Sequence, residues 1–227
     1  MKTLVTQPAA TSFVQIMATA TGRKARLGDA EKLECGAAPF VLKADIALRD
    51  AINTVARLTD DKTRTEVARH AAARKVALDT VGTIRKAATD IAAHADTLNE
   101  RAMTSINSYF DNALPGDGMT ARISAWVADT LKSPEGVAKV KQAAKEDRRV
   151  AAVLHAEPLF LTGITKGLRD SIVTDVIATR LPDAAKQLTD AADLHAIAPK
   201  YEKLAAELPT HLYNSALADQ ADTRVEI

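Results

Sequence analysis

One long segment of the chain contains almost nothing that interrupts a helix. Residues 40–114 hold no proline, and their only glycine is Gly82. Proline breaks a helix and glycine weakens it, so this segment favours long helices. Its second half carries apolar residues spaced alternately three and four apart, the period of a helix packed along a neighbour. This apolar seam consists of Val81, Ile84, Ala88, Ile91, Ala95, Leu98 and Ala102. The pattern predicts one helix over about residues 62–113.

Such a helix cannot bury its seam by itself. At 1.5 Å per residue it would be roughly 78 Å long, and it has to pack against helices of its own chain or of further copies. Alanine allows close approach but buries little area, so a bundle or a multi-copy assembly suits the seam better than an isolated pair. The chain is alanine-rich and only 4% aromatic. We therefore expect an all-α fold, an elongated helical bundle with one long helix and a C-terminal set of short helices.

Prolines and glycines divide the rest of the chain. The run Leu114-Pro115-Gly116-Asp117-Gly118 is its strongest break. The predicted organisation is an N-terminal arm and connector at 1–39, a long helical hairpin at 40–115 and a C-terminal helical subdomain at 116–227. Short helices in the last part are expected to end at four prolines, namely Pro158, Pro182, Pro199 and Pro209.

Three helix starts are predicted from capping patterns. Thr63 and Glu66 form a capping-box pattern at the start of the long helix, although Asp60 or Asp61 could also start it. Thr120 is expected to cap the helix that follows the break. The run Ser133-Pro134-Glu135 places serine at an N-cap and proline at the first helical position, and this helix is expected to reach about Ala156.

The sequence lacks the usual patterns of catalytic and cofactor sites. Its nine glycines are scattered and form no phosphate-binding loop, no nucleophile elbow occurs, and Cys35 is the single cysteine. Asp90 and His94 have the spacing of helical metal ligands, but they are two where a catalytic site needs three. We expect no catalytic residue, no metal and no cofactor, and a protein that is not an enzyme. The single cysteine excludes an intramolecular disulfide and suits a reducing compartment.

Two groups of basic residues are candidates for contact with phosphates. Their members are Arg69, Arg74, Lys75, Lys139, Lys141 and Lys145. Acidic residues are interleaved with both groups, and aromatic side chains for base stacking are missing beside them. The formal net charge of the chain is only +1. A helical adaptor or nucleic-acid-binding module that uses these basic faces is therefore the alternative function.

Charge is uneven at the two ends of the chain. Residues 1–28 contain bases and no acid, whereas residues 183–227 carry eight acids against four bases. These ends either pair between neighbouring copies or are simply solvated. No run reaches 18 apolar residues, so the sequence predicts no transmembrane helix.

Four of the eight aromatic residues carry predictions. Three of them are expected to pack together in the core rather than to form a ligand cage: Tyr109, Phe110 and Trp126. The fourth, Phe160, belongs to a short apolar run, residues 159–161, between a proline and a glycine. This run is either inserted in the core or anchors the chain in a groove of a partner, with Leu159 and Phe160 as the contact residues.

Residues 152–168, AVLHAEPLFLTGITKGL, resemble a short pattern of small helical proteins of tailed bacteriophages and prophages. In that pattern an Ala/Leu helix ends in a proline, an apolar pair and a Thr/Ser-Gly-Leu turn, and here Ile164 replaces the leucine. The resemblance implies a virion or assembly role without an active site. We therefore expect a structural protein that acts through helix–helix contacts in a homo-oligomer or multi-subunit particle, cytoplasmic or virion-associated.

Overall fold

The computed structural model describes residues 2–33 and 36–222, so Cys35 lies outside the described residues. The chain is 83% helical, and no strand occurs in these two ranges, which confirms the all-α prediction. None of the helices described combines the length and the apolar character that a membrane span requires.

The chain forms two compact units. The first contains Met1–Asp96 and Ala192–Ile227, and the second contains Thr97–Ala191. Two helices, α4 (Glu66–Asp111) and α10 (Pro182–Leu212), supply residues to both units. The units are therefore discontinuous in sequence, and their boundaries differ from the three-part division predicted above.

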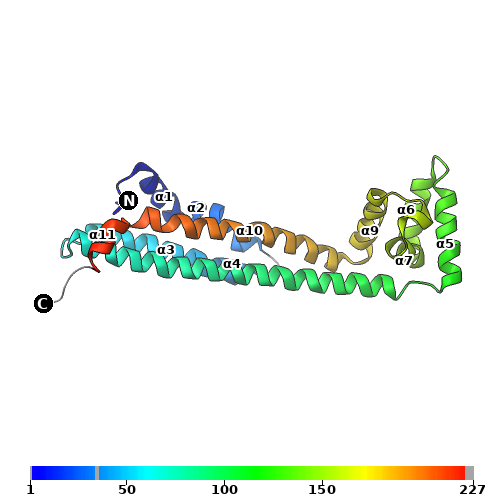
Figure 1. Ribbon diagram of the computed structural model, residues 1–227, viewed down its shortest axis with the longest axis horizontal. Helices are drawn as coiled ribbons and strands as arrows, with labels where there is room; N and C mark the ends of the chain where they lie inside the picture. Colours follow the sequence, from blue (N-terminus) through cyan, green and yellow to red (C-terminus); the bar gives the residue numbers. More distant parts are fainter. Residues whose placement is uncertain (1, 34–35, 223–227) are drawn as a thin grey trace. The chain divides into compact units, whose positions relative to one another are not determined.

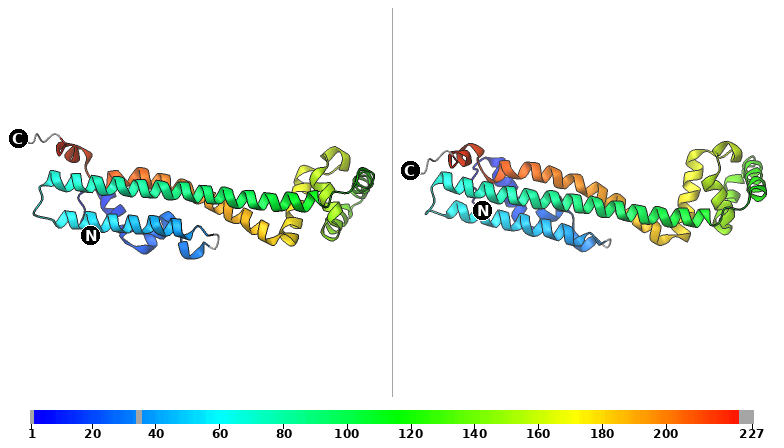
Figure 2. Two further views of the ribbon diagram at one scale, coloured as in Figure 1. Left: turned by 90° about the horizontal axis from the view of Figure 1, so that it is seen from below. Right: turned by 60° about the horizontal axis from the view of Figure 1, so that its bottom comes forward.

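In the first unit, α3 (Ala38–Asp60) lies antiparallel to the first part of α4, and the last part of α10 packs beside them (Figures 1 and 2). The shorter elements of this unit are α1 (Pro8–Ala18), α2 (Ala20–Leu27), the 3₁₀ turn η1 (Ala30–Lys32) and α11 (Ser215–Gln220). Because α1 and α2 both pack on α3, the predicted N-terminal arm is part of the folded unit.

Buried polar contacts fix this N-terminal segment. Arg23 of α2 is buried, and its Nε donates to Asp45 Oδ1 of α3 at 2.7 Å. The hydroxyl of Tyr201, a fully buried residue of α10, donates to the backbone oxygen of Leu27 at 2.8 Å. Burial raises the pKa of Tyr201, so this hydroxyl keeps its proton and remains a donor. Helix α2 is thus bonded to both α3 and α10.

The predicted seam is buried within the single chain. All seven of its residues are at most 7% exposed. Five of them, from Val81 to Ala95, belong to the first unit, and Leu98 and Ala102 belong to the second. Their apolar area is already used inside one copy, so the seam is not a free surface for a second copy.

The long helix begins later than its capping pattern predicts. Its N-cap is Thr65, whose Oγ1 accepts the N–H of Ala68 at 3.2 Å. The predicted cap, Thr63, instead donates its N–H and its hydroxyl to Asp61 at 2.9 and 2.6 Å. This local turn competes with helix, because it offers the backbone another hydrogen-bond partner. The helix predicted over residues 62–113 is therefore Glu66–Asp111.

The prediction that Pro199 and Pro209 end short helices is wrong. Both lie inside α10, which is continuous over 31 residues. A proline inside a helix removes one hydrogen bond and crowds the preceding turn, at a cost of about 3 kcal/mol or more. Around the two prolines α10 buries Leu194, Tyr201, Leu204, Ala205, Leu208 and Leu212. This burial offsets the local cost and keeps the helix continuous.

The second unit adds five shorter helices to its parts of α4 and α10. They are α5 (Asp117–Thr130), α6 (Gly136–Glu146), α7 (Arg148–Ala156), α8 (Leu159–Thr162) and α9 (Lys166–Arg180). Its core is formed by apolar side chains from most of these helices, among them Phe110, Val140, Leu154 and Ile172.

The helix predicted from Ser133 to Ala156 is in fact two helices. Asp147 has extended backbone angles, φ −113° and ψ 111°, and separates α6 from α7. Its carboxylate accepts the N–H of Arg149 at 2.8 Å and so caps α7. Ser133 does not cap α6, because its hydroxyl donates to the backbone oxygen of Thr130 at 2.9 Å.

Candidate protein interaction surface

An exposed aromatic side chain stands out on the second unit. Phe160 is 81% exposed, far more than the other large apolar side chains of the described residues. It lies on α8, a single turn that ends at Gly163, where φ of +65° is a conformation that glycine adopts readily. Thr162 and Ile164 are buried and anchor this turn. A single turn cannot bury all of its sides, so Phe160 and Leu161 project into solvent.

The two residues predicted as contact residues thus have different surroundings. Leu159 packs against the core of the second unit, as the core-insertion alternative expects. Phe160 does not, and Leu161 beside it is 46% exposed. Phe160 and Leu161 are termed the apolar knob below. The role of Phe160 as a partner anchor stays a prediction.

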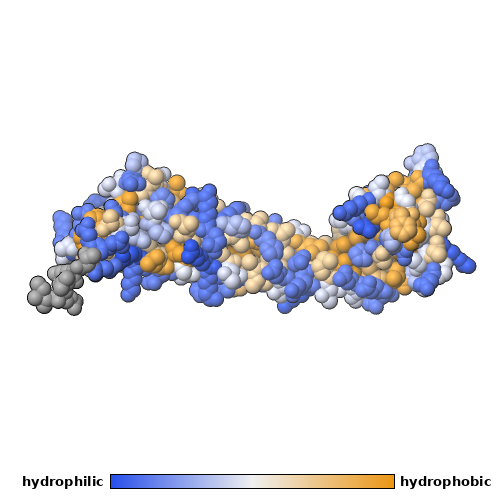
Figure 3. Space-filling model, in the orientation of Figure 1, coloured by the Kyte–Doolittle hydropathy of each residue, from blue (hydrophilic) through white to orange (hydrophobic). Residues whose placement is uncertain are grey.

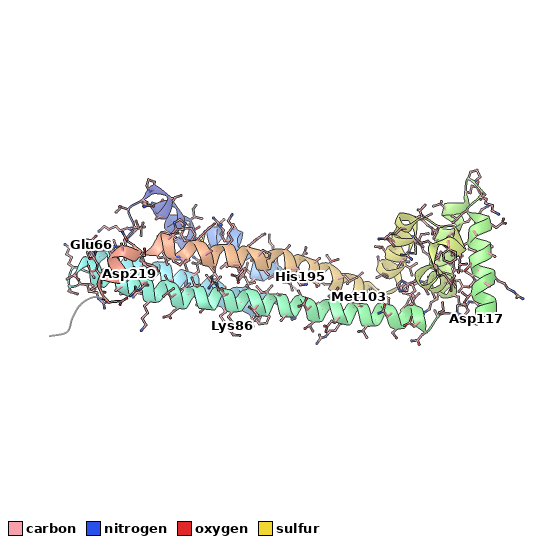
Figure 4. All side chains as sticks on the ribbon, in the orientation of Figure 1. Glu66, Lys86, Met103, Asp117, His195 and Asp219 are labelled. Atoms are coloured by element: carbon pink, nitrogen blue, oxygen red, sulfur yellow. The ribbon has the colours of Figure 1, made fainter. Side chains whose placement is uncertain are left out.

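A hollow of about 370 Å³ lies beside the knob, between α5 and α8. It is lined by Asp117, Thr120, Ala121, Ser124, Ala125, Glu157 and Leu161. Asp117 lies in the first turn of α5 (Figure 4). Thr120 does not cap this helix as predicted, since its hydroxyl donates to the backbone oxygen of Pro115 at 3.0 Å. Asp117 and Glu157 therefore place two carboxylates next to the knob.

A second hollow, termed the Trp126 groove, has a volume of about 300 Å³ and lies between α5, α6 and α7. It is lined by Arg122, Ile123, Trp126, Ala143, Glu146, Asp147 and Val150. Trp126 is 41% exposed here. The prediction that it packs in the core with Tyr109 and Phe110 is wrong, although these two do contact each other edge to face at 5.2 Å.

The two hollows lie on opposite flanks of α5. At 100° per residue, Asp117, Ala121 and Ser124 point to one side of the helix, and Arg122 and Trp126 point to the other. Apolar side chains reach the surface of this unit among hydrophilic ones (Figure 3). One unit therefore carries both an exposed apolar projection and a separate apolar groove.

Charges at the groove are partly neutralised. Arg149 pairs with Asp147 at 2.7 Å, and this hydrogen-bonded pair holds the pKa of the Asp147 carboxyl below its usual range. Glu146 accepts from Gln142 at 2.5 Å. Arg122 is exposed, and no ion-pair partner for it occurs in the described part of the chain. The groove thus presents an unpaired guanidinium, Arg122, from α5 and a carboxylate, Glu146, that only the neutral amide of Gln142 contacts, from α6.

The basic residues proposed to contact phosphates are divided equally between the two units. Three lie in the first unit: Arg69, Arg74 and Lys75. Arg69 Nη1 donates to the backbone oxygen of Thr59 at 3.0 Å. Arg74 pairs with Asp219 and Asp222 at 2.8 and 2.7 Å. Lys75 is exposed. Two of the three cations are therefore occupied by contacts within the chain.

The other three lie in the second unit, on α6: Lys139, Lys141 and Lys145. Lys139 pairs with Glu135 at 3.4 Å, and Lys141 lies 3.8 Å from Asp175. Lys145 is half-buried. Acidic neighbours thus offset most of this positive charge, which weakens the case for phosphate contacts.

The candidate metal pair has other partners. Lys86 pairs with Asp90 at 3.2 Å, and the ring of His94 lies edge-on to Phe40 with centroids 6.1 Å apart. Within residues 2–33 and 36–222, no group of three or more His, Cys, Asp or Glu is placed to hold a metal ion.

Another histidine, His155, lies in the second unit. Its ring stacks on the buried ring of Phe110, with the ring centroids 4.4 Å apart. Burial lowers the pKa of His155, so its imidazole is neutral at pH 7.

Sequence reasoning missed the groove altogether. Its walls come from α5, α6 and α7, which are brought together only by folding. A partial signal was nevertheless present, because Met119, Ile123 and Trp126 recur at helical spacing along α5. The comparisons with family models, curated proteins and solved structures found no match for this chain.

Proposed function

We propose that the chain is a non-enzymatic structural or assembly protein that works by self-association, of the kind found in tailed-phage virions. The observation that carries the proposal is the 81% exposure of Phe160 on a turn anchored by buried neighbours. Aromatic side chains bury large areas, and exposed anchors of this type dominate the energetics of many interfaces.

The segment that resembles phage assembly proteins supports the same reading. Residues 152–168 include α8, so the resembling pattern and the exposed knob coincide. The buried seam supplies stability inside one copy, which leaves the knob and the groove for contacts between copies. Assembly components occur in many copies, so a second copy of this chain is the partner that the proposal names.

Sedimentation velocity over a wide concentration range tests the proposal. The wild-type chain should form larger species as its concentration rises, and Phe160→Ser should remain smaller at each concentration. Leu78→Ser is a matched control, since Leu78 is 52% exposed but lies in the first unit. It should associate like the wild type. A wild-type chain that stays monomeric throughout would overturn the proposal.

Nucleic-acid binding is the weaker alternative, because most of the candidate cations contact acids or backbone carbonyls of the chain itself. It is tested by titrating DNA at increasing salt. Phosphate contacts would give an affinity that falls steeply with salt, whereas we expect no such binding.

A further inference from the structure

We infer that the apolar knob of one copy inserts into the Trp126 groove of a second copy. This inference rests on the proposed self-association and names the two surfaces that meet. The knob and the groove lie on opposite flanks of α5, so one neighbour cannot reach both patches at once and the contact is heterologous.

The groove suits one inserted side chain better than a bound small molecule. Its volume of about 300 Å³ is at the lower limit of small-molecule pockets. Its apolar walls include Ile123, Ala143 and Val150. The indole ring of Trp126 also lines the groove, where an inserted aromatic ring can pack against it. A phenylalanine ring that entered it would leave water and contact another aromatic ring.

Charges on the two walls of the groove set the register of the same pairing. Asp117 and Glu157 lie beside the knob, and the groove is lined by Arg122 on its α5 wall and by Glu146 on its α6 wall. No ion-pair partner of Asp117, Glu157 or Arg122 occurs within the described part of the chain. A knob seated with its carboxylates toward the α5 wall of a neighbour's groove meets the guanidinium of Arg122 and avoids the carboxylate of Glu146. Opposite charges at the rim of an apolar contact steer association and set its register.

A heterologous contact leaves one knob and one groove free at the ends of every open oligomer. Further copies can therefore add at both ends, and the assembly is a ring if the rotation between copies closes, or a filament if it does not. An isologous dimer would instead consume both patches at once. The inference thus predicts growth beyond the dimer.

Two variants that remove opposite halves of the contact test it. Phe160→Ser removes the knob and keeps the groove, whereas Ala143→Phe fills the groove and keeps the knob. Each alone should weaken association by about thirtyfold or more, the effect of losing an interface hot spot. Mixed in equal amounts, they should form a heterodimer that does not grow, because only one knob and one complete groove remain.

A charge exchange supplies a second readout that does not depend on shape. Arg122→Glu should weaken association, and adding Glu157→Arg in the same chain should restore it. Circular dichroism and Trp126 fluorescence check that each variant is folded, and a misfolded Ala143→Phe is replaced by Ala143→Leu.

Association that survives Ala143→Phe but is lost in Phe160→Ser would overturn the groove assignment while leaving self-association intact. Association that survives both would refute the knob as well, and a monomeric wild type would refute the proposed function itself.

Discussion

The buried guanidinium of Arg23 offers a quantitative test of how the N-terminal segment is held. Its side chain is 8% exposed, and its Nε pairs with Asp45 at 2.7 Å. Its Nη1 donates to the backbone oxygens of Met17 and Ala18, each at 3.1 Å, at the end of α1. Replacing it by methionine keeps much of the apolar stem but leaves these three acceptors without their donor.

The expected loss of stability follows from these contacts. Breaking a buried ion pair by removing one partner costs about 3–5 kcal/mol. The Asp45 side chain is 27% exposed, so water solvates the orphaned carboxylate in part. We therefore expect Arg23→Met to lower the free energy of unfolding by about 3 kcal/mol. Arg23→Lys should recover only part of this, because an ammonium cannot reproduce the planar fork of the guanidinium.

Urea unfolding followed by two probes is the assay. Circular dichroism at 222 nm reports helices in both units, whereas fluorescence of Trp126, the single tryptophan, reports the second unit. Asp45→Asn combined with Arg23→Met should cost less than the sum of the single changes, because the two residues form one contact. A loss below about 1 kcal/mol, or an Arg23→Lys variant as stable as the wild type, would refute this account of the ion pair.

Two further predictions concern the first unit. Ile91→Ala, at a fully buried seam position, should cost about 3 kcal/mol by leaving a cavity, and equilibrium unfolding against the exposed-site control Leu78→Ala measures it. His70 Nδ1 accepts the N–H of Asn214 at 3.1 Å, and burial lowers the pKa of His70 below its ordinary 6.5. The bond therefore holds α11 fully above pH 6.5 and is lost as the pH falls below that value, because the undocked state takes up the proton first. The ratio of α11 amide exchange rates, wild type over His70→Gln, should rise by up to about tenfold between pH 6.5 and one unit below it, and a ratio that does not change with pH would contradict this.

The helical class and the existence of the long helix could be predicted because they depend on local period. Every seam residue is buried where the three–four spacing places it, from Val81 to Ala102. The ends of the helix were less predictable. Thr63 and Thr65 are both competent caps, and the choice between them depends on Asp61, which takes the N–H and the hydroxyl of Thr63.

The candidate surface could be predicted only in part. The run at residues 159–161 was recognised as either core or anchor, and no local rule divides Leu159 from Phe160. Their burial differs because α8 rests on the unit through Leu159 and Thr162, which turns Phe160 outward. Trp126 was assigned to the core for the sound reason that tryptophan is usually well buried. Its exposure depends on how α6 and α7 pack beside α5.

By itself the sequence determined what each segment can do alone: helix-forming stretches, their apolar faces and the positions of the strongest breaks. Only the tertiary structure decided which of these local preferences prevail. Pro199 and Pro209 lie within α10 because buried neighbours such as Leu204 and Leu208 stabilise the helix more than the prolines weaken it. Tertiary structure also decided which apolar side chains stay outside, because exposure depends on neighbours that are distant in the sequence.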